Sequence, residues 1–443
     1  MSQPLEAFKN AFKIPELKSR IIFTLVMLAI YRLGCHVPAP GIDGAALAQK
    51  ISQGGGLLGF YDMFSGGAFA RATVFTLGIM PYITASIILS LLIPIIPALE
   101  KLQKEGHQGQ QKINDYTRYG TIVLCIIQSI GIAWFLQGLG REIVPNPGSM
   151  FLFTCVLSFT TGAAFVMWIG EQISEFGIGN GMSLIIFTSI VSRMPAALRH
   201  LIQLVFVSKQ LNMFQALILV FLMVAVIAGA IAITTGQRRI PVQYPRQVKG
   251  RRVSGGQKTY LPLRVNQAGV IPIIFASSIL SLPAYLGDTI RIPIIEQIIR
   301  QLFYPGNIGY AFCYGGLIIF FSFFYTAITF NPVEIADNMK KYGGVIVGVR
   351  PGKATAEYLN HIMTRITLAG SIFLAIIALL PEAVYFFIKV PDWTVVQFFG
   401  GTSLLILVGV ALDTIKQIEQ HLLMRHYDGF SGKAGRIRSR RSF

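Results

Sequence analysis

The chain has 443 residues, of which 53% are hydrophobic and only 13% are charged. Soluble domains carry about 25% charged residues, so this composition excludes an ordinary soluble globular protein. The formal net charge is +18. In a soluble protein such a charge would indicate nucleic-acid binding, but in a membrane protein it indicates Lys and Arg in the loops on one side. We favour the membrane interpretation.

Apolar runs long enough to cross a membrane occur ten times along the chain, since one spanning helix needs about 20 apolar residues. The sequence therefore predicts an all-α integral membrane protein with ten transmembrane helices. The predicted spans are 21–38, 73–98, 119–136, 150–170, 182–201, 212–235, 268–287, 310–330, 366–388 and 398–420.

Two segments outside the spans are also apolar in part. Residues 1–20 carry four basic side chains beside apolar residues on one helical face, which is typical of an amphipathic helix on a membrane surface or of a solvated tail. The 57–71 segment is too short to span and too apolar for an ordinary loop, and Gly66 and Gly67 interrupt any helix there. Such a segment is either buried in protein at membrane depth or forms a short packed loop.

The distribution of basic residues predicts the orientation. An even number of spans places both ends of the chain on one side, and 28 of the 38 Lys and Arg residues fall on that side. The positive-inside rule then predicts that both termini are cytoplasmic, including the basic tail at 423–443. Two basic loops on this side, 236–266 and 331–365, are longer than a helix connection requires. They either dock a large cytoplasmic partner or only fix the topology.

Ten spans divide into two groups of five, at 21–205 and 206–422. An odd number of spans in each half makes the second half enter the membrane from the opposite face, so any repeat between the halves is inverted. The count of spans supports this division, whereas no repeat is visible residue by residue.

The sequence shows no arrangement of residues that would support catalysis. The four cysteines, six histidines and acidic residues show neither metal-ligand nor catalytic spacing, so we expect no metal and no cofactor. The segment 348–354 lacks two features of an ATP-binding phosphate loop, which predicts no direct ATP binding. Six spans contain no charged residue, which disfavours an ion-coupled solute transporter. A secondary transporter and a membrane enzyme remain as alternatives.

Five segments together resemble the SecY family of protein-translocation channels. They are DMFSGGAFARATVFTLGIMPYITASIILSLL (62–92), WIGEQISEFGIGNGMSLIIF (168–187), LPLRVNQAGVIPIIFASS (261–278), FNPVEIADNMK (330–340) and GGTSLL (400–405). The resemblance extends from about residue 5 to residue 425 and brings all ten spans into register.

The resemblance implies a clamshell of two inverted five-helix halves around an hourglass pore. It places an apolar ring at the waist of the pore, on Ile79, Ile83, Ile186, Ile274 and Ile406. It identifies the 57–71 segment as a plug, with Phe60, Tyr61, Asp62, Met63, Phe64, Ser65, Gly66, Gly67 and Ala68. It also assigns Ser90, Gln128, Ser277 and Ser278 to a lateral gate that opens to lipid.

The resemblance further implies a function as the channel of the bacterial inner membrane, which conducts unfolded signal-bearing polypeptides and releases apolar segments into the bilayer. The expected partners are SecE, SecG, the motor ATPase SecA and the ribosome, and no DNA is bound. The chain itself would be no enzyme. The residues expected to dock SecA or the ribosome are Arg238, Arg239, Arg246, Lys249, Arg251, Arg252 and Arg350.

Overall fold

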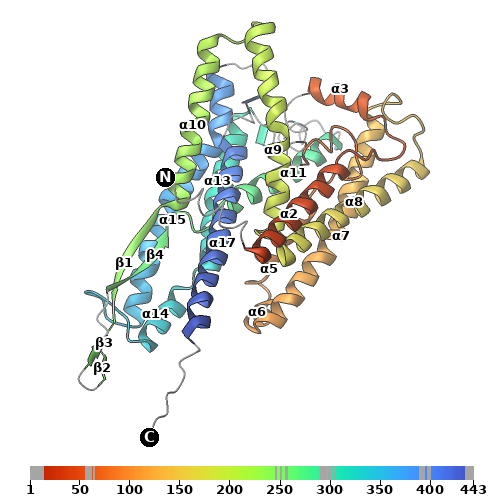
Figure 1. Cartoon of the computed structure of the whole chain (residues 1–443). Helices are drawn as coiled ribbons and strands as arrows, with labels where there is room; N and C mark the ends of the chain where they lie inside the picture. The colour runs from red at the N-terminus through yellow and green to blue at the C-terminus, as the bar shows by residue number, and fades with distance from the viewer. Residues whose placement is uncertain are drawn as a thin grey trace. The chain divides into compact units, whose positions relative to one another are not determined.

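The computed structural model is mainly helical, and Figure 1 shows the elements in chain order. It describes residues 14–54, 62, 65–244, 247–249, 252–254, 258–289, 297, 301–302, 306–388, 395–396 and 401–434. The helices are α2 (Pro15–Gly34), α3 (Gly44–Gly54), α5 (Met80–Leu92), α6 (Pro97–Lys104), α7 (His107–Gly138), α8 (Ser149–Phe176), α9 (Gly181–Ile202) with the π-helical turn η1 (Gln203–Val207), α10 (Met213–Thr235), α11 (Ile271–Thr289), α13 (Ile308–Thr329), α14 (Pro332–Lys341), α15 (Lys353–Ile388) and α17 (Gly401–Ala434). The strands are β1 (Gln237–Gln243), β2 (Gln247–Lys249), β3 (Arg252–Ser254), β4 (Lys258–Arg264) and β5 (Val345–Ile346).

The helices lie where the sequence predicts membrane spans. Among the described residues, seven helices are long and apolar enough to cross a membrane, and the bent pair α5 and α6 adds an eighth. The remaining two predicted spans correspond to α2 and α11. The first helix, α2, begins at Pro15, inside the segment 1–20, whose first 13 residues lie outside the described part of the chain.

The second span differs from its predicted range of 73–98. Its helix, α5, begins only at Met80, because the chain before it is folded in turns. After α5 the chain bends by 99° into α6, near Pro94 and Pro97. Proline disfavours a helical conformation for the residue before it, which accounts for a break at this point.

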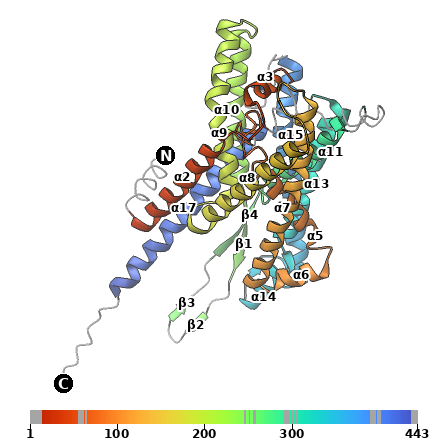
Figure 2. The same cartoon turned by 90° about the vertical axis from the view of Figure 1, so that its right-hand side faces the viewer.

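The described chain forms two compact units, which we consider separately. Unit 1 comprises Met1–Gly54, Tyr61–Met194 and Val410–Phe443, and within it α7 packs against both α5 and α8, while α2 packs against α8. Unit 2 comprises Gly55–Phe60 and Pro195–Gly409, and within it α13 packs against α11 and α15. Figures 1 and 2 show α7 and α8 side by side in both views.

The two basic loops predicted at 236–266 and 331–365 fold together within unit 2. Strand β1 pairs antiparallel with β4 along its whole length, and β5 pairs with the end of β1. In Figure 1, β2 and β3 lie beyond the far end of the β1–β4 hairpin. Strands β1, β4 and β5 share an apolar core with α14 and the start of α15. The buried core residues are Ile240, Val242, Leu263, Phe330, Met339, Ile346, Leu359, Ile362 and Met363.

The sequence did not predict these strands, although β1 has the required alternation. Ile240 and Val242 are buried, whereas the residues between and beside them are exposed. This period of two is the pattern of a strand with one buried face. We call the folded region from β1 to β4, with α14, β5 and the first turns of α15, the basic lobe.

The turn between α8 and α9 (177–181) is held by side chains from two other helices of unit 1. The backbone N–H of Ile178 donates to the Oγ1 of Thr24 on α2 at 3.0 Å. The backbone N–H of Gly179 donates to the Oε1 of Gln417 on α17, also at 3.0 Å. Two backbone donors of this partly buried turn are therefore satisfied, which helps to fix the start of α9.

Candidate functional site

The described part of the 57–71 segment forms a compact turn that is stabilised by hydrogen bonds within the segment. The Oδ1 of Asp62 accepts from the backbone N–H of Ala70 at 2.7 Å, and the Asp62 carbonyl accepts from Gly67 at 3.0 Å. The hydroxyl of Ser65 donates to the Asp62 carbonyl at 3.1 Å and accepts from Phe69 at 3.1 Å. Asp62 therefore organises the segment through both its carboxylate and its backbone.

Two arginines from neighbouring helices bind this turn. Arg32 of α2 donates from Nη1 to the carbonyl of Gly66 at 2.7 Å. Arg193 of α9 forms an ion pair with the Oδ2 of Asp62. The Asp62 side chain is only 2% exposed and that of Arg193 is 28% exposed. A buried carboxylate is tolerated only when it is paired and hydrogen-bonded, and Asp62 meets both conditions.

Apolar and aromatic contacts position the chain that follows this turn. The ring of Phe75 stacks against that of Tyr31 with centroids 6.0 Å apart. A Cβ atom at Gly34 would lie 2.0 Å from the Phe75 ring, so only glycine lets α2 approach this closely. The chain around Phe75, after the segment, is thus packed against α2 within unit 1.

The structure describes five of the nine residues predicted for the plug. Ser65 and Ala68, with Asp62, are buried, in agreement with a segment enclosed by protein. Gly66 and Gly67 both have positive φ, at +67° and +88°, which favours glycine at these two positions. The other four predicted residues, Phe60, Tyr61, Met63 and Phe64, lie outside the described residues.

The five isoleucines predicted for the pore ring are all buried, with at most 7% of each residue exposed. Ile79 immediately precedes α5, Ile83 lies one turn further on, and Ile186 lies on α9, all in unit 1. Ile274 on α11 and Ile406 on α17 belong to unit 2. The closure of these residues into one ring stays a prediction.

The predicted gate residues also divide between the units. In unit 1, Ser90 on α5 and Gln128 on α7 are half-buried, and these two helices pack against each other. In unit 2, Ser277 and Ser278 on α11 are buried, and the Ser277 hydroxyl donates to the carbonyl of Ile274 at 2.9 Å. A gate formed by these four residues stays a prediction.

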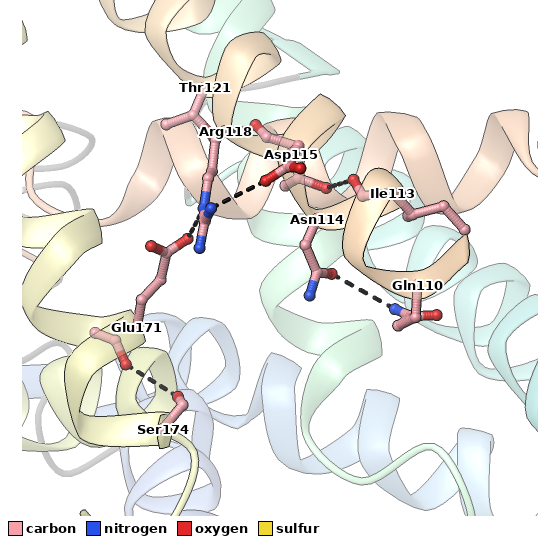
Figure 3. Close-up of polar contacts among 10 residues, drawn as sticks. Gln110, Ile113, Asn114, Asp115, Arg118, Thr121, Glu171 and Ser174 are labelled. Atoms are coloured by element: carbon pink, nitrogen blue, oxygen red, sulfur yellow. Dashed lines mark hydrogen bonds and ion pairs between the residues drawn. The ribbon is translucent and has the colours of Figure 1, made fainter. Parts of the chain in front are cut away.

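A further polar cluster, which the sequence did not predict, joins α7 to α8 (Figure 3). Arg118 of α7 donates from Nε to the Oε1 of Glu171 on α8 at 2.6 Å. It also donates from Nη1 to the Oδ1 of Asp115, one turn earlier on α7, at 2.9 Å. The side chain of Arg118 is 46% exposed, so this ion pair contributes only about 0–1 kcal/mol to stability.

The basic lobe presents several of the predicted docking residues. Arg238 and Arg239 are exposed on β1. Arg350 is exposed in a loop bracketed by Gly348 and Gly352, which have φ values of +85° and +100°. The Arg350 carbonyl accepts from the Thr355 hydroxyl at 2.8 Å, so the loop is anchored to α15.

The remaining docking residues are described less fully. The backbone of Lys249 lies in β2 and that of Arg252 in β3. Arg246 and Arg251 lie outside the described residues. Within the described part of the chain, no group of three or more His, Cys, Asp or Glu residues could hold a metal ion.

Sequence reasoning missed the pairing of Arg193 with Asp62. Arg193 was visible as a charge that interrupts a predicted span, and an ionisable residue within a membrane span is a functional candidate whose partner must be sought. Its partner lies in the 57–71 segment, far away in the sequence. Only the fold brings the two side chains together.

Comparison with known proteins gives consistent matches. A family model described as SecY matches residues 73–415. The protein translocase subunit SecY of Thermotoga maritima is 44% identical over 98% of this chain and 100% of its own length. That of Thermus thermophilus is 43% identical over 98% of this chain and 99% of its own length.

Two solved structures resemble the fold. One, described as a protein conducting channel, has a TM-score of 0.65 and 18% identity, and covers 93% of this chain and 96% of its own. The other, Sec61 in a canine ribosome-channel complex from the endoplasmic reticulum, has a TM-score of 0.62 and 17% identity with the same coverage.

Proposed function

The chain belongs to the SecY family, and we propose on that premise that it is the pore-forming subunit of a protein translocase. Its substrates are unfolded signal-bearing polypeptides, which cross the membrane through the channel. The observation that carries this function is the match to translocase subunits over nearly the whole of both chains. The alternative of a solute transporter finds no support among these relatives.

The buried isoleucines suit a constriction that passes polypeptides but retains ions. An apolar constriction excludes water and ions when it is empty, and it offers no fixed charge to bind a passing chain. Ile79 and Ile83 lie on one face of the chain at the start of α5, because residues i and i+4 share a helical face. The 57–71 segment, held by Arg32 and Arg193, acts as the plug that closes the channel at rest.

We assign the basic lobe to the cytoplasm, where it docks the partner that supplies energy. The excess of Lys and Arg on this side supports the orientation and a cytoplasmic location of both termini. One structural relative is described in complex with a ribosome, and the exposed Arg350 offers a further contact for the motor SecA. The chain itself catalyses no reaction.

The remaining features follow from the family. SecE and SecG join the chain in a bacterial inner membrane, and apolar segments of the substrate leave sideways into lipid. The resemblance assigns this exit to the spans that correspond to α5, α7, α11 and α13, and within them to Ser90, Gln128, Ser277 and Ser278. Weak polar contacts between helices break at modest cost, which suits a gate that opens.

A translocation assay tests this function. The chain is reconstituted into liposomes with its co-purified small subunits, and SecA, ATP and a signal-bearing precursor are added. We expect the precursor to become protected from external protease only when ATP and an intact signal are both present. Lack of protection, while the Thermotoga maritima protein works in the same assay, would contradict the proposal, and solute-flux assays would follow.

A further inference from the structure

We infer that Gln417 is a positioning residue for the channel constriction: it holds the turn before α9 and so sets where that helix places Ile186. The inference rests on the proposed function, because that function gives Ile186 its place in the constriction. It is drawn from the hydrogen bonds of the 177–181 turn, the packing of Gly179 and the closeness of Ile186 to this turn in the sequence.

The turn is held by side chains from several elements of unit 1. Four backbone N–H groups between Ile178 and Ser183 donate to side-chain oxygens at 2.9–3.1 Å. The four acceptors are Thr24 of α2, Gln417 of α17, Ser174 of α8 and Asn180 of the turn itself. These donors are therefore occupied within the protein rather than available to an anion at the start of α9. Their hydrogen bonds fix the backbone of the turn.

Gly179 is the point at which α17 contacts the turn. Its φ is +89°, a conformation that favours glycine. A Cβ atom there would lie 2.9 Å from the Cδ1 of Leu184 on α9 and 3.3 Å from the Oγ1 of Thr414 on α17. Thr414 and Gln417 are three residues apart and share one face of α17. One face of α17 thus both packs against Gly179 and accepts its N–H.

The bond from Gln417 restrains the most adaptable residue of the turn. Glycine populates positive and negative φ about equally, so its conformation must be set by its contacts. The backbone N–H of Gly179 donates to the Oε1 of Gln417 at 3.0 Å. Without this acceptor the N–H loses its partner, and the glycine is free to turn toward another one. A change of backbone angles at this position redirects the helix that follows.

Ile186 lies close enough to the turn to follow such a change. It stands five residues after Gly181, the first residue of α9, which is about 8 Å along a helix. The first turn of α9 is already formed at this end, because the N–H of Leu184 donates to the carbonyl of Asn180 at 3.0 Å. A hydrogen-bonded helix of this length moves as a unit, so a shift of the turn also shifts Ile186.

The experiment measures the exposure of position 186 when the Gln417 acceptor is removed. Q417M removes the acceptor at nearly constant size, whereas Q417E keeps an acceptor oxygen. Q420M is the matched control, because Gln420 is exposed on the same helix. Each variant is combined with Ile186→Cys or with Ile406→Cys, purified with the small subunits and reconstituted into lipid.

The first readout is the rate at which a water-soluble, membrane-impermeant maleimide labels the introduced thiol. The same protein without the introduced thiol gives the background from its own four cysteines. The second readout is the resting ion conductance of Q417M, Q417E and Q420M, again without the introduced thiol.

We expect Q417M to raise the labelling rate of Ile186→Cys, and the resting conductance, about fivefold, as for the loss of one hydrogen bond. Labelling of Ile406→Cys, on α17 itself, should change less than about twofold, as should both readouts of Q417E and Q420M. A bond needed only for stability would lower the melting temperature without distinguishing the two thiol positions.

Three outcomes would overturn the positioning role: unchanged labelling of Ile186→Cys in Q417M, an equal rise at both thiol positions, or Q417E labelled as fast as Q417M. If Q417M fails to accumulate, Thr24→Val and Thr24→Ser test the same turn through the N–H of Ile178. Faster labelling with Val alone supports the role, and equal rates reject it. Labelling needs no transport, so a wild-type channel that imports no intact precursor refutes the proposed function separately.

Discussion

The hydroxyl of Tyr31 lies 2.8 Å from the Oγ of Ser189, and this hydrogen bond joins α2 to α9 in the interior of unit 1. The Ser189 hydroxyl also donates to the carbonyl of Ile185 at 2.9 Å. Because a hydroxyl has a single proton, Tyr31 is the donor and Ser189 the acceptor. The same two helices carry Arg32 and Arg193, so this bond helps to position both anchors of the 57–71 segment.

This donor assignment predicts unequal effects of two substitutions. Tyr31→Phe removes the donor but leaves Ser189 bonded to Ile185, and should cost about 1 kcal/mol. Ser189→Ala removes the oxygen acceptor of the buried tyrosine hydroxyl and leaves it only the weakly accepting thiol of Cys35, which should cost about 1–3 kcal/mol. Thermal unfolding of the purified protein in detergent measures both, with Tyr119→Phe as an exposed control. A larger loss for Tyr31→Phe would refute the assignment.

Two features make a side chain at Gly66 unfavourable: a left-handed backbone conformation and a tight contact. Its φ is +67°, and a Cβ atom would lie 3.2 Å from the Cα of Ser189. Gly66→Ala should therefore strain the closed position by about 1–2 kcal/mol and raise the resting ion conductance. Gly131→Ala is the matched control, because a Cβ there meets nothing within 4 Å and alanine favours a helix. Equal conductance of the two variants would count against a closed segment held at Gly66.

The positions of the helices were predictable because each depends on a local property, the length of an apolar run. The strands of the basic lobe were not predictable, because the surrounding charges indicated loops. The alternation of Ile240 and Val242 with exposed residues is too short to outweigh that signal. The partner of Arg193 was not predictable either. A contact between α9 and a segment that precedes α5 depends on the fold, which composition and spacing do not reveal.

Arg118 makes a contact whose weakness can itself be tested. Glu171→Gln should lower stability by at most about 1 kcal/mol, and the loss should shrink further in high salt, since the pair is partly exposed. Thermal unfolding at low and high salt measures this dependence. Lys104→Gln, which breaks the exposed pair with Glu100, is the control. A large loss unaffected by salt would mean that Glu171 has another structural role.

If the five isoleucines line a pore ring, a polar side chain of similar size should weaken the seal, whereas an apolar one should preserve it. Ile83→Asn should wet the constriction, raise ion leak and admit precursors with poor signals, whereas Ile83→Leu should preserve the seal. Ile406→Asn should act in the same way from the other unit. Conductance and the import of a signal-defective precursor measure these effects. If both Asn variants keep the selectivity and conductance of the wild type, the ring lies elsewhere.

A docking role for Arg350 predicts that substitution of this residue impairs the action of the motor but leaves the fold intact. Its side chain is exposed and the loop is held through backbone atoms, by the Thr355 hydroxyl and by two glycines with positive φ. Arg350→Glu should therefore abolish SecA-driven import while the protein still assembles with its small subunits. Lys353→Glu reverses an exposed charge three residues away and should leave import largely intact. Import and co-purification, measured on the same preparations, separate the two effects, and normal import by Arg350→Glu would reject a docking role for this residue.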